Sequence, residues 1–238
     1  MDREGKKIKS FGGGSGNGDV KFSKPRGIAV TKDKYLLVSD NHKIQKVSMD
    51  GMSLASVGKK GPRSMQFNCP DSIAISPISR LVYVVDNEND RVQVFNPDLT
   101  FSHAFGSKGS GNGQFQSPHG IAFDVQGFVY ITDKDNHRVQ KFSQDGGFVT
   151  HFGSRKSGPG QLESPVGIAI DTGATGLVYV SERGSHRISV FTSDGVFVRS
   201  FGRKGSNIDQ FINPYGMGFG NDGSLYICDF SNDRLVVY

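Results

Sequence analysis

The chain has 238 residues, of which 35% are hydrophobic and 21% are charged, and its formal net charge is +5. This length and apolar content allow a substantial core. No stretch approaches the ~18 consecutive apolar residues of a membrane helix, and the opening MDREGKKIKS lacks the apolar segment of a signal peptide. We therefore expect no membrane association and a cytoplasmic location.

A proline that stands shortly before an apolar triplet recurs along the chain. The five copies read PRGIAV, PDSIAI, PHGIAF, PVGIAI and PYGMGF, and they begin at Pro25, Pro70, Pro118, Pro165 and Pro214. Their spacings are 45, 48, 47 and 49 residues. A fixed period in the forties is typical of a β-propeller, in which each unit forms one blade.

The unit at residues 118–153 shows what each copy contains. Four short runs rich in Val, Ile, Phe and Tyr, namely IAF, FVYIT, RVQKF and FVTHF, are separated by DVQG, DKDNH and SQDGG. Such runs suit half-buried strands, and the intervening glycines suit tight turns. The sequence predicts an all-β fold of four-stranded antiparallel blades.

The two ends of the chain complement each other. NDRLVVY at residues 232–238 corresponds to a third strand, whereas DREGKKIKSFG at residues 2–12 corresponds to a turn and a fourth strand. We expect Lys7–Phe11 to complete the last blade beside Leu235–Tyr238, which leaves no unpaired edge in the ring. Residues 1–238 then form a single domain, a monomeric propeller of five blades.

The two cysteines fall at non-equivalent positions of the units. Cys69 precedes a repeated proline, whereas Cys228 lies within a predicted strand. This placement favours two reduced, partly buried thiols over a disulfide or a metal site.

Several segments resemble NHL repeats over essentially the whole chain. They are DNHKIQKV, DKDNHRVQKF, the DG turns, the closing FG and the loop GSKGSGNGQF. The similarity is to the C-terminal propellers of tripartite-motif proteins, which have six blades, so the alternative is that this chain is part of a six-bladed ring. The resemblance implies a post-transcriptional role, with single-stranded or stem-loop RNA bound on the positive face.

The propeller topology sorts the loops onto two faces. The blade-to-blade loops and the loops between strands two and three share one face, and together they carry a net charge of about +5. The remaining turns share the other face and carry about −4. A basic face suits RNA phosphates or an acidic protein partner, although such lysines can also be simply solvated.

Each Pro-x-Gly element has one variable residue at the entrance of the innermost strand. We expect these residues to ring the channel on the basic face, where an arginine can hold a phosphate and an aromatic ring can stack on a base. For Tyr215, packing within the channel is an equal alternative, and Asp71 and Glu88 should make blade two a poor phosphate contact. The predicted RNA-binding residues are Arg26, His119, Tyr215, Lys134, Arg183, Phe230, Lys24, Lys108, Arg155 and Lys204.

Three histidines, His42, His137 and His186, occupy equivalent positions, as three metal ligands would. Equivalent positions of a ring lie far apart, whereas zinc needs ligands within about 2.0–2.3 Å of one point. We therefore interpret these histidines as inter-strand hydrogen-bonding groups and expect no metal and no cofactor. Because the NHL family includes a metal-dependent lyase, a lyase-like enzyme stays as an alternative.

Taken together, the sequence predicts a non-enzymatic RNA-binding propeller. A protein-interaction platform, or a substrate-recognition domain of a ubiquitin ligase, is the first alternative, and the lyase-like enzyme is the second. One irregularity stands apart from the repeat: the loop DNHK at residues 40–43 is two residues shorter than DKDNHR at residues 133–138. This shortening should open a gap on the basic face beside Arg26.

Overall fold

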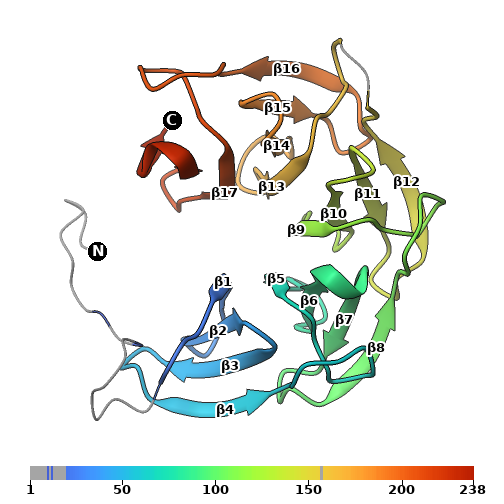
Figure 1. Ribbon diagram of the computed structural model, residues 1–238, viewed down its shortest axis with the longest axis vertical. Helices are drawn as coiled ribbons and strands as arrows, with labels where there is room; N and C mark the ends of the chain where they lie inside the picture. Colours follow the sequence, from blue (N-terminus) through green and yellow to red (C-terminus); the bar gives the residue numbers. More distant parts are fainter. Residues whose placement is uncertain (1–9, 11, 13–19, 156–157) are drawn as a thin grey trace.

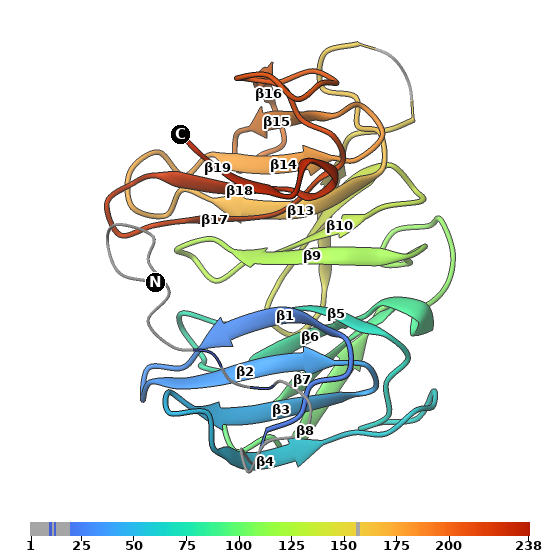
Figure 2. The same ribbon diagram turned by 60° about the vertical axis from the view of Figure 1, so that its left-hand side comes forward.

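The computed structural model describes residues 10, 12, 20–155 and 158–238. Five antiparallel sheets radiate from a central channel, as Figures 1 and 2 show. Blade one contains β1 (Pro25–Val30), β2 (Tyr35–Asp40), β3 (Lys43–Ser48) and β4 (Ser53–Val57); blade two β5 (Pro70–Ile75), β6 (Val82–Asp86), β7 (Arg91–Phe95) and β8 (Phe101–Phe105); blade three β9 (Pro118–Phe123), β10 (Val129–Asp133), β11 (Arg138–Phe142) and β12 (Phe148–Phe152); blade four β13 (Pro165–Ile170), β14 (Val178–Glu182), β15 (Arg187–Phe191) and β16 (Phe197–Phe201); and blade five β17 (Pro214–Phe219), β18 (Leu225–Asp229) and β19 (Arg234–Val237). Two short 3₁₀ helices, η1 (Asn87–Asn89) and η2 (Phe230–Asn232), lie between strands two and three of blades two and five.

The five-bladed propeller predicted from the repeat is confirmed. The repeated prolines begin the inner strands β1, β5, β9, β13 and β17, and each inner strand pairs with the second strand of its own blade. Blade five has three strands in the described part of the chain. The fourth strand expected at Lys7–Phe11, and with it the predicted closure of the ring, lies outside the described residues. No helix in those described ranges is long and apolar enough to cross a membrane.

Adjacent blades are held together by apolar side chains that alternate along the strands. Between blades two and three, Val92 and Val94 pack with Phe115, Ile121 and Phe142 in one buried cluster. Three further clusters of the same kind join the other neighbouring pairs of blades. Blades two, three and four therefore each contribute one face to the core before them and one face to the core after them.

A buried acid at the end of strand two organises the loop that follows. In blade three, Asp133 Oδ2 accepts hydrogen bonds from Asn136 Nδ2 (2.9 Å), Arg138 Nε (2.8 Å) and Gln140 Nε2 (3.0 Å), while its Oδ1 accepts one from the N–H of Gln116 (2.7 Å). Asp86, Glu182 and Asp229 hold an arginine in the same way in blades two, four and five. This buried pair gives a structural reason for the recurring Asp and Arg of the DKDNHRVQKF pattern.

The histidines at the start of strand three join one blade to the next. His137 Nδ1 accepts a hydrogen bond from the N–H of Ser164 (3.1 Å), and His186 Nδ1 accepts one from the N–H of Asn213 (3.1 Å). Asp90 does the same in blade two, where its Oδ1 accepts from the N–H of Ser117 (2.9 Å). They are hydrogen-bonding groups, as predicted, but the bonds run between blades rather than between strands of one blade.

These histidines should make stability depend on pH. Burial lowers the pKa of His137 and of His186 below the ordinary 6.5, and a protonated Nδ1 can no longer accept a hydrogen bond. The stability that they contribute is thus full above pH 6.5 and is lost as the pH falls through the lowered pKa. The double variant His137→Asp, His186→Asp copies Asp90 and should flatten this dependence in urea unfolding between pH 7 and 5. An unchanged slope would contradict the assignment.

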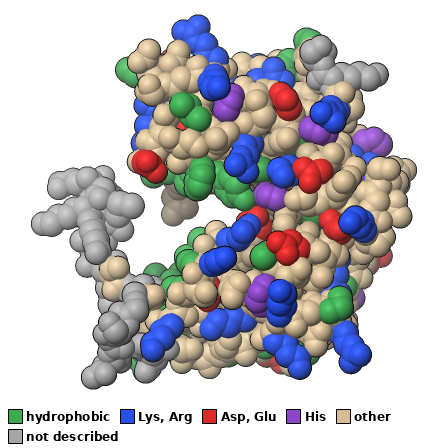
Figure 3. Space-filling view, in the orientation of Figure 1, with side chains coloured by type: hydrophobic (Ala, Val, Ile, Leu, Met, Phe, Trp, Pro, Cys, Tyr) green, Lys and Arg blue, Asp and Glu red, His purple; other side chains and the backbone are tan. Residues whose placement is uncertain are grey.

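Among the residues that the structure describes, nothing covers the outward faces of blades one and five as neighbouring blades cover the interior ones. Leu235 on β19 is 51% exposed, whereas Val92 and Val139 at the same position are fully buried. Ile28 on β1 is 62% exposed, whereas its counterpart Ile121 is buried. Figure 3 shows the open space that separates these two faces among the described residues. The described sheets thus form an arc whose two ends present apolar surface.

The two thiols are free, but the prediction that both are partly buried is wrong for one of them. Cys69 is half-buried, whereas Cys228 is exposed. Cys228 lies on the uncovered face of blade five, at the position that Val85 occupies in blade two, where blade three buries it. Burial here depends on the neighbouring blade rather than on the strand itself.

Candidate nucleic-acid interface at the channel mouth

The variable residues of the Pro-x-Gly elements surround the central channel, as their spacing predicts. They line one cavity of about 230 Å³ together with the two residues that follow each of them in the inner strands. Because each inner strand begins at its proline, the next residue of every blade stands at the same height of the ring. The five residues are Arg26, Asp71, His119, Val166 and Tyr215.

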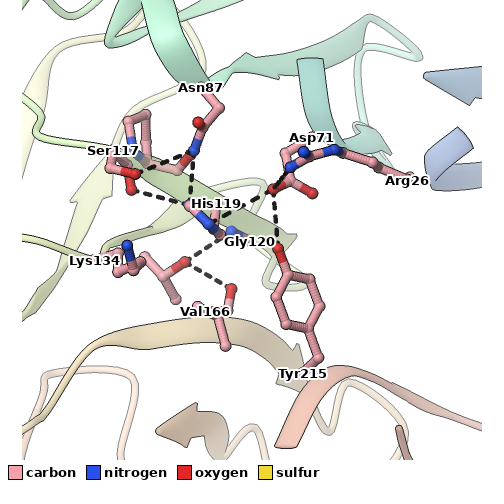
Figure 4. A network of polar contacts seen from close by, with 12 residues as sticks. Arg26, Asp71, Asn87, Ser117, His119, Gly120, Lys134, Val166 and Tyr215 are labelled. Atoms are coloured by element: carbon pink, nitrogen blue, oxygen red, sulfur yellow. Dashed lines mark hydrogen bonds and ion pairs between the residues drawn. The ribbon is translucent and has the colours of Figure 1, made fainter. Parts of the chain in front are cut away.

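Asp71 gathers three of these side chains from three other blades (Figure 4). Its Oδ2 accepts a hydrogen bond from Arg26 Nη1 (3.3 Å) and one from Tyr215 Oη (3.2 Å), and it lies 3.8 Å from His119 Nε2. The Asp71 side chain is buried, whereas that of Arg26 is 40% exposed. Part of the arginine's charge is therefore balanced within the channel, and its remaining donors are open to solvent.

His119 belongs to this network rather than to the open surface. Its Nδ1 lies 3.0 Å from the carbonyl oxygen of Ser117 and 2.7 Å from Asn87 Nδ2. Burial lowers the pKa of His119, although the neighbouring Asp71 carboxylate opposes that shift. The imidazole is consequently neutral at pH 7, so it can donate or accept a hydrogen bond but supplies no positive charge to a phosphate.

The aromatic rings form a row from the channel to the rim. The Tyr215 ring lies 6.1 Å from that of His119 and 6.0 Å from that of Phe230. Burial, followed by the charge of Asp71, raises the pKa of Tyr215, so its phenol stays a hydrogen-bond donor. Phe230, at the start of η2, is 62% exposed. An exposed ring beside a half-buried one provides a surface on which an unpaired base can stack.

Most of the predicted cations are exposed around this mouth, and Figure 3 shows Lys and Arg side chains over the same face. Lys108 and Lys204 stand in loops whose backbones are held by isolated bridges to Phe115 and Phe211. Within the described ranges, Lys134 is paired with Asp135 (3.1 Å), and Arg26 with Asp71. In the same ranges, the remaining predicted cations form no ion pair; they are Lys24, Lys108, Arg155, Arg183 and Lys204.

The shortened loop at residues 40–43 borders a cavity, but the cavity does not lie beside Arg26, where the sequence predicts a gap. The cavity has a volume of about 330 Å³, and its lining includes Lys21, His42, Lys43 and Lys59. Lys43 stands where the other blades carry the arginine that fills this space with its guanidinium. Arg26 does not line the cavity, because its side chain turns into the channel toward Asp71.

Sequence reasoning missed one member of the site. Asn87 occupies the position of Lys134, Arg183 and Phe230 in the loop after strand two, and its amide donates to the carbonyl oxygen of Pro118 (2.7 Å). The equivalence of the four positions was a signal that could have found it. Asn87 is neither charged nor aromatic, so its side chain alone does not indicate a phosphate or base contact. Asp71, expected from the sequence only to repel phosphate, is the acceptor that joins the blades.

The comparisons with known proteins agree with this architecture. Residues 115–142, which contain β9, β10 and β11, match the family model described as NHL repeat. Part of one blade of this β-propeller, residues 115–142, therefore matches an NHL repeat. NHL repeat-containing protein 3 of Mus musculus is 33% identical over 90 residues, 36% of this chain and 26% of that protein. Protein brain tumor of Drosophila melanogaster is 28% identical over 109 residues, 44% of this chain and 10% of that protein. The chain therefore spans about a quarter of the length of the first relative and about a tenth of the second.

Solved structures show the same fold at low sequence identity. Virginiamycin B lyase from Staphylococcus aureus is 16% identical with a TM-score of 0.66, and the match covers 90% of this chain and 69% of that chain. A chain of the nidogen/laminin complex is 19% identical with a TM-score of 0.68, and the match covers 90% and 74% of the two chains. At such identities the likeness concerns the arrangement of the blades and not the activity.

Proposed function

We propose that this NHL propeller is a monomeric, cytoplasmic RNA-binding module that holds single-stranded RNA, or the loop of a stem-loop, on its basic face. The observation that carries the proposal is the exposed Phe230 ring beside Tyr215, with exposed cations around it that have no ion-pair partner in the described part of the chain. A base can stack on the ring while phosphates lie against Lys204 and Arg183. A role in post-transcriptional regulation follows from such binding.

The channel favours binding over catalysis. Its acid, Asp71, already accepts hydrogen bonds from Arg26 and Tyr215, and neutral His119 lies against Ser117 and Asn87. Across the described residues, no three or more His, Cys, Asp or Glu side chains are grouped so that they could hold a metal ion. We therefore propose a non-enzymatic role. The same exposed cations also suit an acidic protein partner, which is the second candidate function.

Selection from a randomised RNA pool tests the proposal. At moderate salt we expect an enriched sequence or hairpin loop, and its affinity should fall linearly on a plot of log K against log salt. Five contacts by unpaired cations give a slope of about −3.5 for single strands. A pool that yields no enriched RNA would rule out the RNA proposal and favour the acidic protein partner.

Phe230→Ala should weaken binding of the selected RNA by about 1–3 kcal/mol, because one base loses its stacking surface. The ring is exposed, so the substitution should leave the free energy of unfolding nearly unchanged. Val125→Ala, an exposed apolar truncation in the turn between β9 and β10, is the matched control on the opposite face. Fluorescence anisotropy compares the two variants, and equal affinities would exclude stacking on Phe230.

A further inference from the structure

A second cavity opens on the face opposite the basic loops, between blades one and two. It has a volume of about 650 Å³, within the range of small-molecule sites. The turn between β1 and β2 borders it on one side, and the turn between β5 and β6 borders it on the other. Tyr35, Val30, Ile75, Val82 and two prolines supply apolar surface, and three cations, Lys32, Lys46 and Arg80, supply positive charge.

Blade three shows the same position with a carboxylate beside the lysine, next to a smaller cavity of about 340 Å³. Lys141 on β11 lies over the rings of Phe128 (4.4 Å) and Tyr130 (5.0 Å). Its Nζ is 3.7 Å from Asp124 Oδ2 and donates a hydrogen bond to the carbonyl oxygen of Ser193 (3.2 Å). Tyr130 Oη also donates to Asp124 Oδ2 (3.1 Å). The ammonium group is buried, and a carboxylate balances its charge.

Blade one has a lysine at the position of Lys141 but no acid at the position of Asp124. Lys46 on β3 lies over the Tyr35 ring (4.8 Å), as Lys141 lies over Phe128. Thr31 replaces Asp124: Thr31 Oγ1 accepts the N–H of Tyr35 (2.9 Å), as Asp124 Oδ1 accepts the N–H of Phe128 (2.9 Å). Leu37 replaces the phenol of Tyr130, since both pair with the lysine across strands two and three.

The charges around Lys46 leave it without a direct counter-ion in the described chain. Asp33 lines the cavity, and Asp98 lies near enough to feel the ammonium group, but neither forms an ion pair with it. Asp98 Oδ1 instead accepts hydrogen bonds from the N–H (3.0 Å) and Oγ1 (2.7 Å) of Thr100. Lys32 and Arg80, both exposed, also form no ion pair among the described residues.

From this comparison we infer that the cavity binds an organic anion, a carboxylate attached to an apolar or aromatic group. The ligand's carboxylate takes the place that Asp124 occupies beside Lys141, and so contacts Lys46 with Lys32 and Arg80 close by. Its apolar part lies on Tyr35 and Val82. The carboxylate belongs either to a free small acid or to an Asp or Glu side chain of a peptide, since both present a carboxylate beside an apolar group.

Titration of the whole chain with two probes tests the site. The probes are 3-phenylpropionate and an acetylated Glu-Leu dipeptide amide, with 3-phenylpropanol as the uncharged control. We expect dissociation constants of about a millimolar or tighter for at least one anionic probe, and at least tenfold weaker binding of the alcohol. Binding of the propionate alone points to a free acid, whereas stronger binding of the dipeptide points to a peptide segment. If neither anion binds, the inference is wrong.

Two variants locate the binding, followed by NMR chemical shifts or calorimetry. Lys46→Met keeps the length of the side chain without its charge and should weaken binding at least tenfold, whereas Lys34→Gln, in the same turn but outside the lining, should not change it. The double variant Thr31→Asp, Leu37→Tyr rebuilds the cluster of blade three and should block the probes with its own carboxylate. If the double variant does not fold, Lys46→Met still decides: unchanged affinity there would place the anion elsewhere and overturn the inference.

Discussion

Asp133→Asn should lower the free energy of unfolding by about 3–5 kcal/mol, the largest effect that we expect from a single conservative change. The carboxylate is fully buried and holds Arg138 at 2.8 Å, and the Arg138 side chain is only 7% exposed. An asparagine in its place leaves that guanidinium without its counter-ion. Asparagine also has one acceptor oxygen and one NH2 donor in place of the two carboxylate oxygens, so Asn136 and Gln140 can lose their acceptor.

Asp229→Asn in blade five is the matched control. It removes the same kind of ion pair, but the Arg234 side chain is 34% exposed, so water can solvate the charge that is left behind. Val236 stands at the position of Gln140, so blade five also lacks that hydrogen bond. We expect a loss of about 1–2 kcal/mol in urea unfolding. Equal losses in the two variants would show that burial of the arginine does not set the cost.

The repeat made the blades predictable. One proline, one closing glycine and four apolar runs per unit determine where strands begin and turn, because alternation and turn residues act locally. The sorting of loops between two faces follows from topology alone, so the exposed lysines such as Lys108 and Lys204 were also within reach of the sequence. Strand positions and the face on which each loop lies follow from the order of the chain, so both can be predicted from the sequence.

Contacts between side chains of different blades were harder to predict from the sequence. The meeting of Arg26, Tyr215 and His119 at Asp71 depends on the width of the channel and the direction of each side chain across it, and no periodicity records either. The exposure of Cys228 depends on what covers the blade, and not on the strand that carries it. Lys46 and Lys141 have the same side chain at the same position, but only one has an acid beside it.

The central claim is that RNA binds the basic face, and two matched triple variants test it most directly. Lys108, Arg155 and Lys204 are exposed on that face, whereas Lys32, Lys34 and Arg80 are exposed on the opposite one. Replacing either set by Gln changes the net charge by the same amount, and both sets are exposed, so both variants should remain folded. Only the substitution of Lys108, Arg155 and Lys204 should remove phosphate contacts.

The measurement is the affinity of each variant for the selected RNA at several salt concentrations. For the Lys108, Arg155, Lys204 variant we predict a salt slope shallower by about 2, corresponding to three lost phosphate contacts, together with a marked loss of affinity at low salt. The Lys32, Lys34, Arg80 variant should keep the slope of the unaltered protein. Equal slopes in the two variants would contradict the account, because binding would then follow net charge and not the basic face.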